Sequence, residues 1–235
     1  MRDDGRLLVA SYNVHRCVGA DGRNDPRRVA DVVRETAALV IGLQEIETAA
    51  NGRELSQLDA LARETGYEAV AGAIEAGDRR GFGNALLTTL PILAIRRFDI
   101  SVPKREPRGL LDVEIDWHGR PLRVLNTHFG LSGAERRVQV MLVLGELHLE
   151  REGLTVLLGD FNEWLPGGRP LRALAHRFGR GSSPRTFPSR RPLFSLDRIW
   201  VQPRAALAGV RVHGSRLARA ASDHLPLVAT VVPGR

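Results

Sequence analysis

Short apolar runs of β-strand length recur along almost the whole chain, and this repetition most limits the folds that it can adopt. The runs cover residues 7–12, 39–43, 68–73, 84–89, 92–100, 110–116, 122–126, 154–158, 196–201, 206–212 and 225–231. Many strands with few helices indicate two stacked sheets flanked by helices, because every sheet must bury an apolar face. No linker or repeat divides the chain, so we predict one domain over residues 1–235.

Three segments between the strands are predicted to be amphipathic helices. The first begins at Asp25-Pro26, an N-cap followed by proline at the first helical position, and the second spans residues 55–62. The third begins with SGAE at residues 132–135, which matches a capping box. Its spacing predicts that the following residues face the core: Val138, Met141, Leu142 and Gly145. A hairpin turn is expected at Gly119, within DWHGR.

The composition is that of an ordinary globular protein, with 43% hydrophobic and 26% charged residues. Cys17 is the only cysteine, so the sequence excludes an internal disulfide and a cysteine metal cluster. The first residues, MRDDGRLLVAS, lack the apolar core of a secretory signal, and no run is long enough to span a bilayer. We therefore expect a cytoplasmic protein without a transmembrane segment, and we expect a monomer.

The net charge is +7, and Lys104 is the only positive residue that is not an arginine. Such a charge attracts anionic partners such as nucleic acid, phospholipid surfaces or phosphorylated metabolites. A GC-rich genome also favours arginine over lysine, so the charge alone does not identify a phosphate partner. Residues 177–192 hold five arginines and three prolines and are predicted to form a long loop, either functional or simply solvated.

Polar side chains stand at one tip of several predicted strands. They are Asn13 and His15 after the first run, Gln44 and Glu45 after the second, Asn126 to His128, Asp160 and Asn162 after two later runs, and Asp197, Asp223 and His224 beside the last ones. Each alone has an ordinary explanation, since Asn and Asp favour turns. Their repetition indicates a site, because α/β proteins deliver site residues from strand tips on one rim.

The residue types at these tips narrow the chemistry. Carboxylate and amide oxygens without cysteine suit a hard cation such as Mg²⁺ or Mn²⁺. A carboxylate beside a histidine orients the ring and tunes its basicity. Metal-assisted hydrolysis of a phosphoester uses all of these parts.

Four of these tips resemble motifs of the endonuclease/exonuclease/phosphatase superfamily, the DNase I-like proteins. The chain has QE at residues 44–45, NTH at 126–128, GDFN at 159–162 and SDH at 222–224, in order and across nearly its whole length. It is similar to a compact bacterial subfamily. The resemblance implies a four-layer α/β/β/α sandwich of two mixed sheets flanked by helices. It also implies a phosphoester hydrolase dependent on Mg²⁺ or Mn²⁺, and we predict a phosphodiesterase that uses in-line attack of water on phosphorus.

The same resemblance assigns roles at the metal and at the attacking water. Glu45 resembles the principal metal ligand, with Asn13 beside it in the metal and phosphate site. Asp223 resembles a residue near the metal in some members. Asp160 resembles the residue that orients or deprotonates the attacking water, and His224 resembles the catalytic histidine. Which of these last two is the base stays open, as does the number of metals.

Further roles follow for the groups around the scissile phosphate. Asp197 resembles the carboxylate that orients the catalytic histidine, and Asn162 the amide that contacts phosphate. His128 resembles the second histidine, which stabilises or protonates the leaving oxygen. Asn84, in RRGFGNALLT, is either a substrate contact or a structural amide. Arg108, in REPRGLL, either neutralises a phosphate or is one more surface arginine.

His15 is the main departure from the superfamily pattern, because AP endonucleases place a metal carboxylate at this position. A contact with substrate is one interpretation of His15, and mere space filling is the other. The missing carboxylate and the compact length favour a lipid or small-molecule phosphodiesterase, so that the partner is a phospholipid headgroup or another phosphoester. The positive charge and the arginine-rich loop favour a DNA endonuclease or exonuclease instead. A non-catalytic binding module is a third hypothesis, against which the complete set of polar tips argues.

Overall fold

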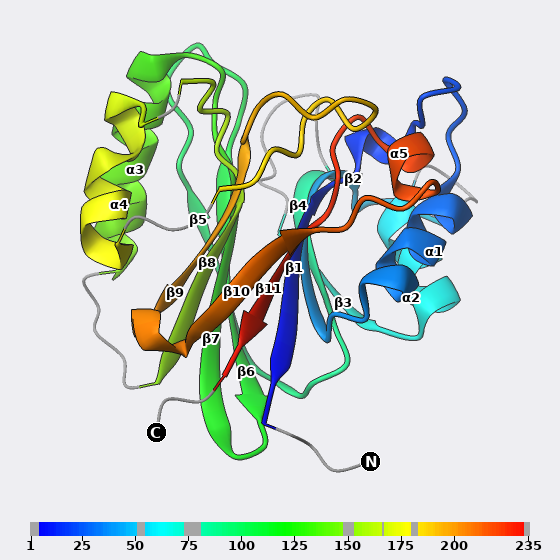
Figure 1. Cartoon of the computed structure of the whole chain (residues 1–235), viewed down its shortest axis with the longest axis horizontal. Coiled ribbons are helices and arrows are strands. Elements are labelled where there is room, and N and C mark those ends of the chain that lie inside the picture. The colour runs from blue at the N-terminus through cyan, green and yellow to red at the C-terminus, as the bar shows by residue number, and fades with distance from the viewer. Residues whose placement is uncertain are drawn as a thin grey trace.

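The computed structural model describes residues 5–50, 55–72, 81–147, 153–165, 167–179 and 183–232. Its strands form two sheets that pack face to face, with helices on both outer faces (Figure 1). This is the predicted two-sheet α/β sandwich. Residue 73 of the third predicted strand and residues 180–182 of the predicted loop lie outside the described residues.

The first sheet has six strands in the order β10-β11-β1-β2-β4-β3. They are β1 (Leu7–Asn13), β2 (Val40–Glu47), β3 (Glu68–Ala71), β4 (Phe82–Thr88), β10 (Leu207–Val212) and β11 (Leu227–Val231). The second sheet has five strands in sequential order. They are β5 (Ile92–Asp99), β6 (Gly109–Trp117), β7 (Arg120–His128), β8 (Leu154–Asp160) and β9 (Asp197–Gln202). The expected hairpin joins β6 to β7 through a turn at Gly119, whose φ is +79°.

The helices cover the outer faces of the two sheets. The six-stranded sheet carries α1 (Pro26–Thr36), α2 (Gln57–Thr65) and α5 (Ala218–Ala221), and the five-stranded sheet carries α3 (Gly133–Leu147) and α4 (Arg172–Phe178). Short 3₁₀ turns occur at His15–Cys17, Arg169–Leu171 and Arg204–Ala206. The Asp25 carboxylate caps α1 by accepting from the Arg28 N–H, and Ser56 and Asp59 form a capping box on α2. No helix in the described part of the chain combines the length and hydropathy needed to cross a membrane.

Each sheet contains one parallel pair of strands, and these two pairs position the polar tips. β1 runs parallel to β2 through the crossover helix α1, and β7 runs parallel to β8 through α3. All other pairings among the described strands are antiparallel. The carboxyl ends of parallel neighbours lie at the same edge. Asn13 is therefore level with Gln44 and His128 is level with Asp160.

The layer between the sheets is mostly apolar, and a pair of side-chain amides crosses it near the polar strand ends. Leucine and valine side chains from both sheets fill most of this layer. Within it, Gln44 Nε2 donates to Asn126 Oδ1 at 2.7 Å, and Asn126 Nδ2 donates to the carbonyl oxygens of Leu43 and Ala85. Gly42 leaves the space, since a Cβ there would lie 2.9 Å from Asn126 Cγ. The side-chain amides of Gln44 and Asn126 thus connect the two sheets.

The helix α3 begins where the sequence predicts, but it presents the opposite face to the core. The predicted inner residues Val138, Met141 and Leu142 are exposed, and so is Gly145. The buried face includes polar residues that bond to groups outside the helix: Gln139 Oε1 accepts the Gly130 N–H, and Arg136 pairs with Glu163. These partners lie outside the helix, so the spacing of apolar residues within the helix could not predict them.

Candidate active site

Two side chains from the six-stranded sheet reach the edge where the polar strand ends gather, and the backbone geometry of β1 and β2 orients them. Asn13 is the last residue of β1 and Glu45 lies in β2. The β2 register shifts between Leu43 and Ile46, and Glu45 has a φ of +56°. A bulge of this kind re-aims a side chain and occurs often beside active sites. Here it brings the Glu45 carboxylate to 3.0 Å from Asn13 Nδ2.

Asn13 reaches this cluster through its amide nitrogen. Its Nδ2 donates to Glu45 Oε1 and to Asp160 Oδ2, each at 3.0 Å, while its Oδ1 accepts the backbone N–H of His15 at 3.0 Å. The engaged oxygen identifies the orientation of the amide. An amide N–H is a donor and not a cation ligand. Asn13 therefore joins two carboxylates from different sheets.

Asp160 ends β8 and is the common neighbour of two histidines. His224 Nε2 lies 3.6 Å from Asp160 Oδ2, and His128 Nε2 lies 3.6 Å from the same oxygen. Asp160 Oδ1 accepts the backbone N–H of Asn162 at 2.9 Å. All four side chains are buried. The oxygen Oδ2 of Asp160 is thus the geometric centre of the cluster.

The His224 side of Asp160 carries a second carboxylate. His224 Nδ1 lies 2.8 Å from Asp197 Oδ2, and Thr186 Oγ1 donates to the same oxygen. The Phe187 ring stands 4.9 Å from the His224 ring, centroid to centroid. Burial by itself lowers the pKa of His224, but the carboxylates of Asp197 and Asp160 outweigh it and raise the pKa to about 10. The metal-free imidazole is therefore a cation that donates from both nitrogens.

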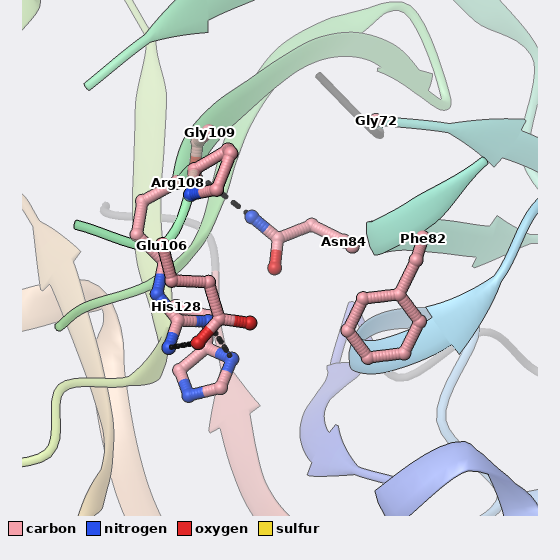
Figure 2. Close-up of a pocket in the computed structure, with 9 residues that line it drawn as sticks. Gly72, Phe82, Asn84, Glu106, Arg108, Gly109 and His128 are labelled. Atoms are coloured by element: carbon pink, nitrogen blue, oxygen red, sulfur yellow. Dashed lines mark hydrogen bonds and ion pairs between the residues drawn. The ribbon is translucent and has the colours of Figure 1, made fainter. Parts of the chain in front are cut away.

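The His128 side carries a guanidinium instead of a carboxylate (Figure 2). Arg108 is buried, with one N–H group 3.0 Å from His128 Nδ1 and another donating to Glu106 Oε2 at 3.0 Å. Burial and the Arg108 charge lower the pKa of His128 to about 3. Because a guanidinium has only donors, His128 Nδ1 must accept, and the proton of the neutral ring lies on Nε2. His128 is thus a neutral donor facing Asp160.

Asn162 lies beside His128 at the turn that follows β8, with a φ of +49°. Its Nδ2 is 3.0 Å from His128 Nε2 and 2.8 Å from the Phe129 carbonyl oxygen. The Phe129 carbonyl must accept from an N–H of the Asn162 amide. A protonated His128 Nε2 must instead donate to the oxygen of that amide. The two contacts favour opposite orientations of the Asn162 amide. A substrate oxygen that takes the Nε2–H bond leaves Nδ2 to the carbonyl.

His15 and Asp223 lie together at the open rim of this cluster. His15 Nδ1 is 3.9 Å from Asp223 Oδ1 and 3.2 Å from the Val18 carbonyl oxygen, and both side chains are about two-fifths exposed. His15, Arg16 and Cys17 all have positive φ, which is uncommon for residues other than glycine. This turn holds the His15 N–H on Asn13. His15 therefore acts on the cluster through its backbone.

Asn84 is the predicted site residue that is most fully engaged elsewhere. Its Nδ2 donates to the carbonyl oxygen of Gly109 at 2.8 Å, and the side chain is buried (Figure 2). It lines a narrow cleft together with Arg108 and His128. The bond to Gly109 fixes the start of β6, so Asn84 fits the structural interpretation of the two that the sequence left open.

The donor set at this edge fits a hard divalent cation. Asp160, Asp197 and His224 form a compact cluster whose ligand atoms all lie within 4.8 Å of one another. His224 Nδ1 and Asp197 Oδ2 are already bonded to each other, however. Glu45 is about one quarter exposed and has an oxygen facing the cluster, 3.9 Å from His128 Nε2. Glu45 with the Asp160 carboxylate supplies the oxygen ligands that Mg²⁺ and Mn²⁺ take.

Sequence reasoning missed three residues that support the predicted ones. Glu106 holds Arg108, Thr186 holds Asp197, and Phe187 packs on His224. Thr186 and Phe187 belong to the arginine-rich segment, where no periodicity marks them. Glu106 stands two residues before Arg108 in REPR, and a pair of opposite charges in a loop ordinarily indicates only a solvated surface.

Comparisons with known proteins identify the family of the chain. Residues 10–224 match the model of the Endonuclease/Exonuclease/phosphatase family. The chain is 31% identical over 241 residues to YbhP of Escherichia coli K12, an uncharacterised protein, with 95% of each chain covered.

Solved structures of other members have the same fold. An endonuclease/exonuclease/phosphatase from Beutenbergia cavernae superposes with a TM-score of 0.76 at 23% identity, covering 97% of this chain and 72% of that one. A mannosyl-6-phosphatase from Bacteroides thetaiotaomicron superposes with a TM-score of 0.74 at 21% identity, covering 95% and 98%. The chain belongs to the endonuclease/exonuclease/phosphatase family, whose members are phosphoesterases or nucleases.

Proposed function

We propose that this protein is a Mg²⁺- or Mn²⁺-dependent phosphodiesterase that hydrolyses its substrate by in-line attack of water on phosphorus. The observation that carries the proposal is the convergence of two oppositely tuned histidines on one oxygen, Asp160 Oδ2, each at 3.6 Å. A binding module has no need for such a buried arrangement, whose polar groups cost free energy unless they are fully paired.

Glu45 is the proposed principal metal ligand, with Asp160 as a second carboxylate. Asn13 holds both of them through Nδ2, and His15 and Asp223 stand at the rim where further ligands or water would complete the shell. A bound divalent cation would polarise a phosphoryl oxygen and offset developing negative charge. The chain's own contribution is to fix two carboxylates from different sheets within reach of one site.

Asp160 is the proposed acceptor for the proton of the attacking water. His224 already shares a proton with Asp197 through Nδ1, and its charged form cannot accept another. Its Nε2–H would instead donate to a phosphoryl oxygen as charge develops there. Such preorganised donors commonly make the largest contribution to the rate.

His128 is proposed to donate Nε2–H to the phosphoryl or leaving oxygen without giving up the proton. A neutral imidazole whose other nitrogen accepts from Arg108 has no readily transferred proton, so stabilisation fits the geometry better than protonation. Asn162 is the proposed companion donor to phosphate. Arg108 is engaged by His128 and Glu106, so we now propose a supporting role for it rather than direct contact with phosphate.

A metal-supplemented activity panel tests the proposal. It compares bis(p-nitrophenyl) phosphate, plasmid and abasic DNA, sphingomyelin, inositol phosphates and mannose 6-phosphate, each with Mg²⁺, Mn²⁺ or chelator. We expect phosphodiester turnover that chelator abolishes and that Glu45→Gln reduces about 100-fold or more. The matched control is Glu68→Gln, an exposed carboxylate on the edge strand β3. Equal turnover by wild type and Glu45→Gln would refute the metal assignment.

The same panel distinguishes between the candidate substrates. If DNA is the substrate, binding must weaken steeply with salt, because phosphate contacts release counterions. Cleavage of small or lipid phosphodiesters with DNA left intact at low salt supports the compact-hydrolase alternative. Monomeric state and cytoplasmic location stay predictions, which sedimentation and fractionation would test.

A further inference from the structure

A cleft of about 910 Å³ opens beside the proposed active centre, between α4, the segment after β8 and the segment before β9. We call it the aromatic cleft, because Trp164, Phe194 and Trp200 line it together with Leu193, Ala175 and Arg198. Ligand sites typically have this volume, with mostly apolar walls and a few placed polar groups. None of the catalytic roles proposed above uses it.

The mouth of the aromatic cleft exposes large apolar side chains. Trp164 is 39% exposed, Leu165 69% and Leu193 59%, and all three line the same opening. Single exposed leucines are ordinary on a protein surface, but a group around a concave opening is typical of a binding site. The walls therefore favour a ligand with an apolar body, either aromatic or acyl.

The polar groups of the aromatic cleft are mainly cationic. Arg198, on β9, lines the cleft and donates from one terminal N–H group to Ser183 Oγ, while its buried Nε has no hydrogen-bond partner among the described residues. Arg172 and Arg185 line the opening as well. Glu163 is the carboxylate among the described lining residues, and it is already bonded to Arg136 and to the Leu165 N–H. Glu163 and Asp197 act on Arg198 only from a distance, and it forms no close ion pair with a described carboxylate, so its partly buried guanidinium favours an anionic ligand group.

The cleft adjoins the proposed active centre through the chain and through aromatic contacts. Its lining residue Glu163 directly follows Asn162, and Arg198 directly follows Asp197. Trp164 contacts Phe187 edge to face at 5.6 Å between centroids, and Phe187 in turn packs on His224 at 4.9 Å. A molecule whose phosphate lies at His224 would therefore reach the cleft past Phe187.

We propose that the aromatic cleft binds an amphipathic anion, an apolar group that carries an acidic group of its own, and that this is the part of the substrate attached to the scissile phosphate. The second half of this statement rests on the proposed phosphodiesterase function. The first half concerns binding alone, so metal-free protein tests it separately.

Two probes that share one body test the binding half. 8-Anilinonaphthalene-1-sulfonate carries an acidic group, and N-phenyl-1-naphthylamine is the same body without it. Trp164 and Trp200 line the cleft, so each probe is detected by emission sensitised by tryptophan in chelator-treated protein. We expect one site per chain, with the sulfonate bound at least tenfold more tightly than the neutral probe.

Variants assign this binding to the aromatic cleft. Arg198→Gln is expected to weaken the sulfonate about tenfold and leave the neutral probe unchanged, since only the charged contact is lost. Ala175→Trp fills the cleft from α4 and is expected to exclude both probes, which keeps the test valid if Arg198→Gln does not fold. Arg27→Gln, an exposed arginine on α1, is the matched control. Equal binding by Ala175→Trp and wild type would overturn the proposal.

Hydrolysis tests the substrate half. Two p-nitrophenyl phosphodiesters are compared, one with methyl as the second group and one with a carboxyphenyl group. We expect Ala175→Trp to raise KM at least tenfold for the carboxyphenyl ester alone, with kcat for the methyl ester unchanged. Probe binding without this KM difference would overturn the substrate half. Binding only to phosphatidylglycerol vesicles, and to neither probe, would overturn the proposal in favour of a membrane contact.

Discussion

Two histidines lie at the same distance from one carboxylate oxygen, yet the regions around them set them to opposite charge states. His224 and His128 each place Nε2 3.6 Å from Asp160 Oδ2, and both are buried. The Nδ1 atoms differ: Asp197 stands behind His224, whereas Arg108 stands behind His128. The charge behind each ring therefore decides whether it meets the substrate as a cation or as a neutral donor.

This difference shows why residue type and position alone do not define a catalytic role. Burial lowers the pKa of both imidazoles, and only the His224 side has carboxylates enough to reverse that effect. Exchanging the groups behind the rings should exchange their behaviour. Five experiments break or sharpen the contrast, with effects of decreasing size.

The largest expected effect is the separation of the two pKa values in metal-free protein. We expect about 10 for His224 and about 3 for His128, on opposite sides of the ordinary value of 6.5. Nitrogen-15 NMR of the histidine rings measures both and also identifies the tautomer. His128 should be protonated on Nε2 alone at pH 5. A ring proton on Nδ1 would contradict the proposed role of Arg108.

The same values fix the sign of the pH effect on unfolding. His224 stabilises the fold fully below pH 6.5, and this contribution is lost as the pH rises toward 10. His128 contributes above pH 6.5, and its contribution is lost as the pH falls toward 3. Urea unfolding of metal-free protein should show these opposite slopes as the difference in unfolding free energy between wild type and His224→Gln or His128→Gln.

The next effect is on turnover when the shared oxygen is altered. Asp160→Asn keeps the shape of the side chain but removes the charge that both histidines face. We expect kcat to fall about 10³-fold, because the proposed proton acceptor is lost. The control is circular dichroism melting, since the amide leaves two buried donors with a weaker acceptor. Retention of a tenth of wild-type turnover would transfer the base role to His224.

A smaller effect is expected on the His224 side alone. Asp197→Asn removes the carboxylate 2.8 Å from Nδ1, so the pKa of His224 should fall. We expect kcat to fall about 100-fold at neutral pH and to recover partly at lower pH, where the ring regains its proton. The pH profile of kcat distinguishes this from simple unfolding. An unchanged profile would show that the charge of His224 is irrelevant.

The smallest effect is expected on the His128 side. Arg108→Met frees Nδ1 and removes the group that fixes the tautomer, so we expect about a tenfold loss in kcat. Arg108→Lys still offers an N–H donor and should retain more activity. Glu106→Gln should cost less than either, since Glu106 acts through Arg108. Greater activity in Arg108→Met than in Arg108→Lys would refute the positioning role.

The sequence identified the strand tips well because strand ends and polar residues are both local features. Each of Asn13, Glu45, His128, Asp160 and His224 lies at or near the end of a strand, and the two parallel pairs set Asn13 level with Gln44 and His128 level with Asp160. The family resemblance supplied the roles. Neither source shows how an amide or a guanidinium is oriented, because those contacts form across the sheets.

The predictions for Arg108 and α3 show this limit. Arg108 was expected to meet phosphate or solvent, yet its neighbour His128 comes from β7, an element twenty residues away in the chain. In α3 the apolar stripe was assigned to the core, but Arg136 and Gln139 hold the buried face through bonds to the Glu163 and Gly130 segments. The buried face of α3 is polar because its residues bond to other segments of the chain. Helical spacing alone does not show such partners.

The amide bridge of Gln44 and Asn126 has a consequence for the alignment of the reaction centre. Glu45 and Asp160 belong to different sheets, and most of the layer between those sheets is filled by apolar contacts, which have no preferred direction. Contacts of that kind resist separation of the sheets but do not resist sliding. Directional bonds from Asn126 to Leu43 and Ala85 do resist it. The buried Asn126 carboxamide thus helps to hold the two sheets in position. Its loss would leave each sheet intact but would displace Glu45 relative to Asp160.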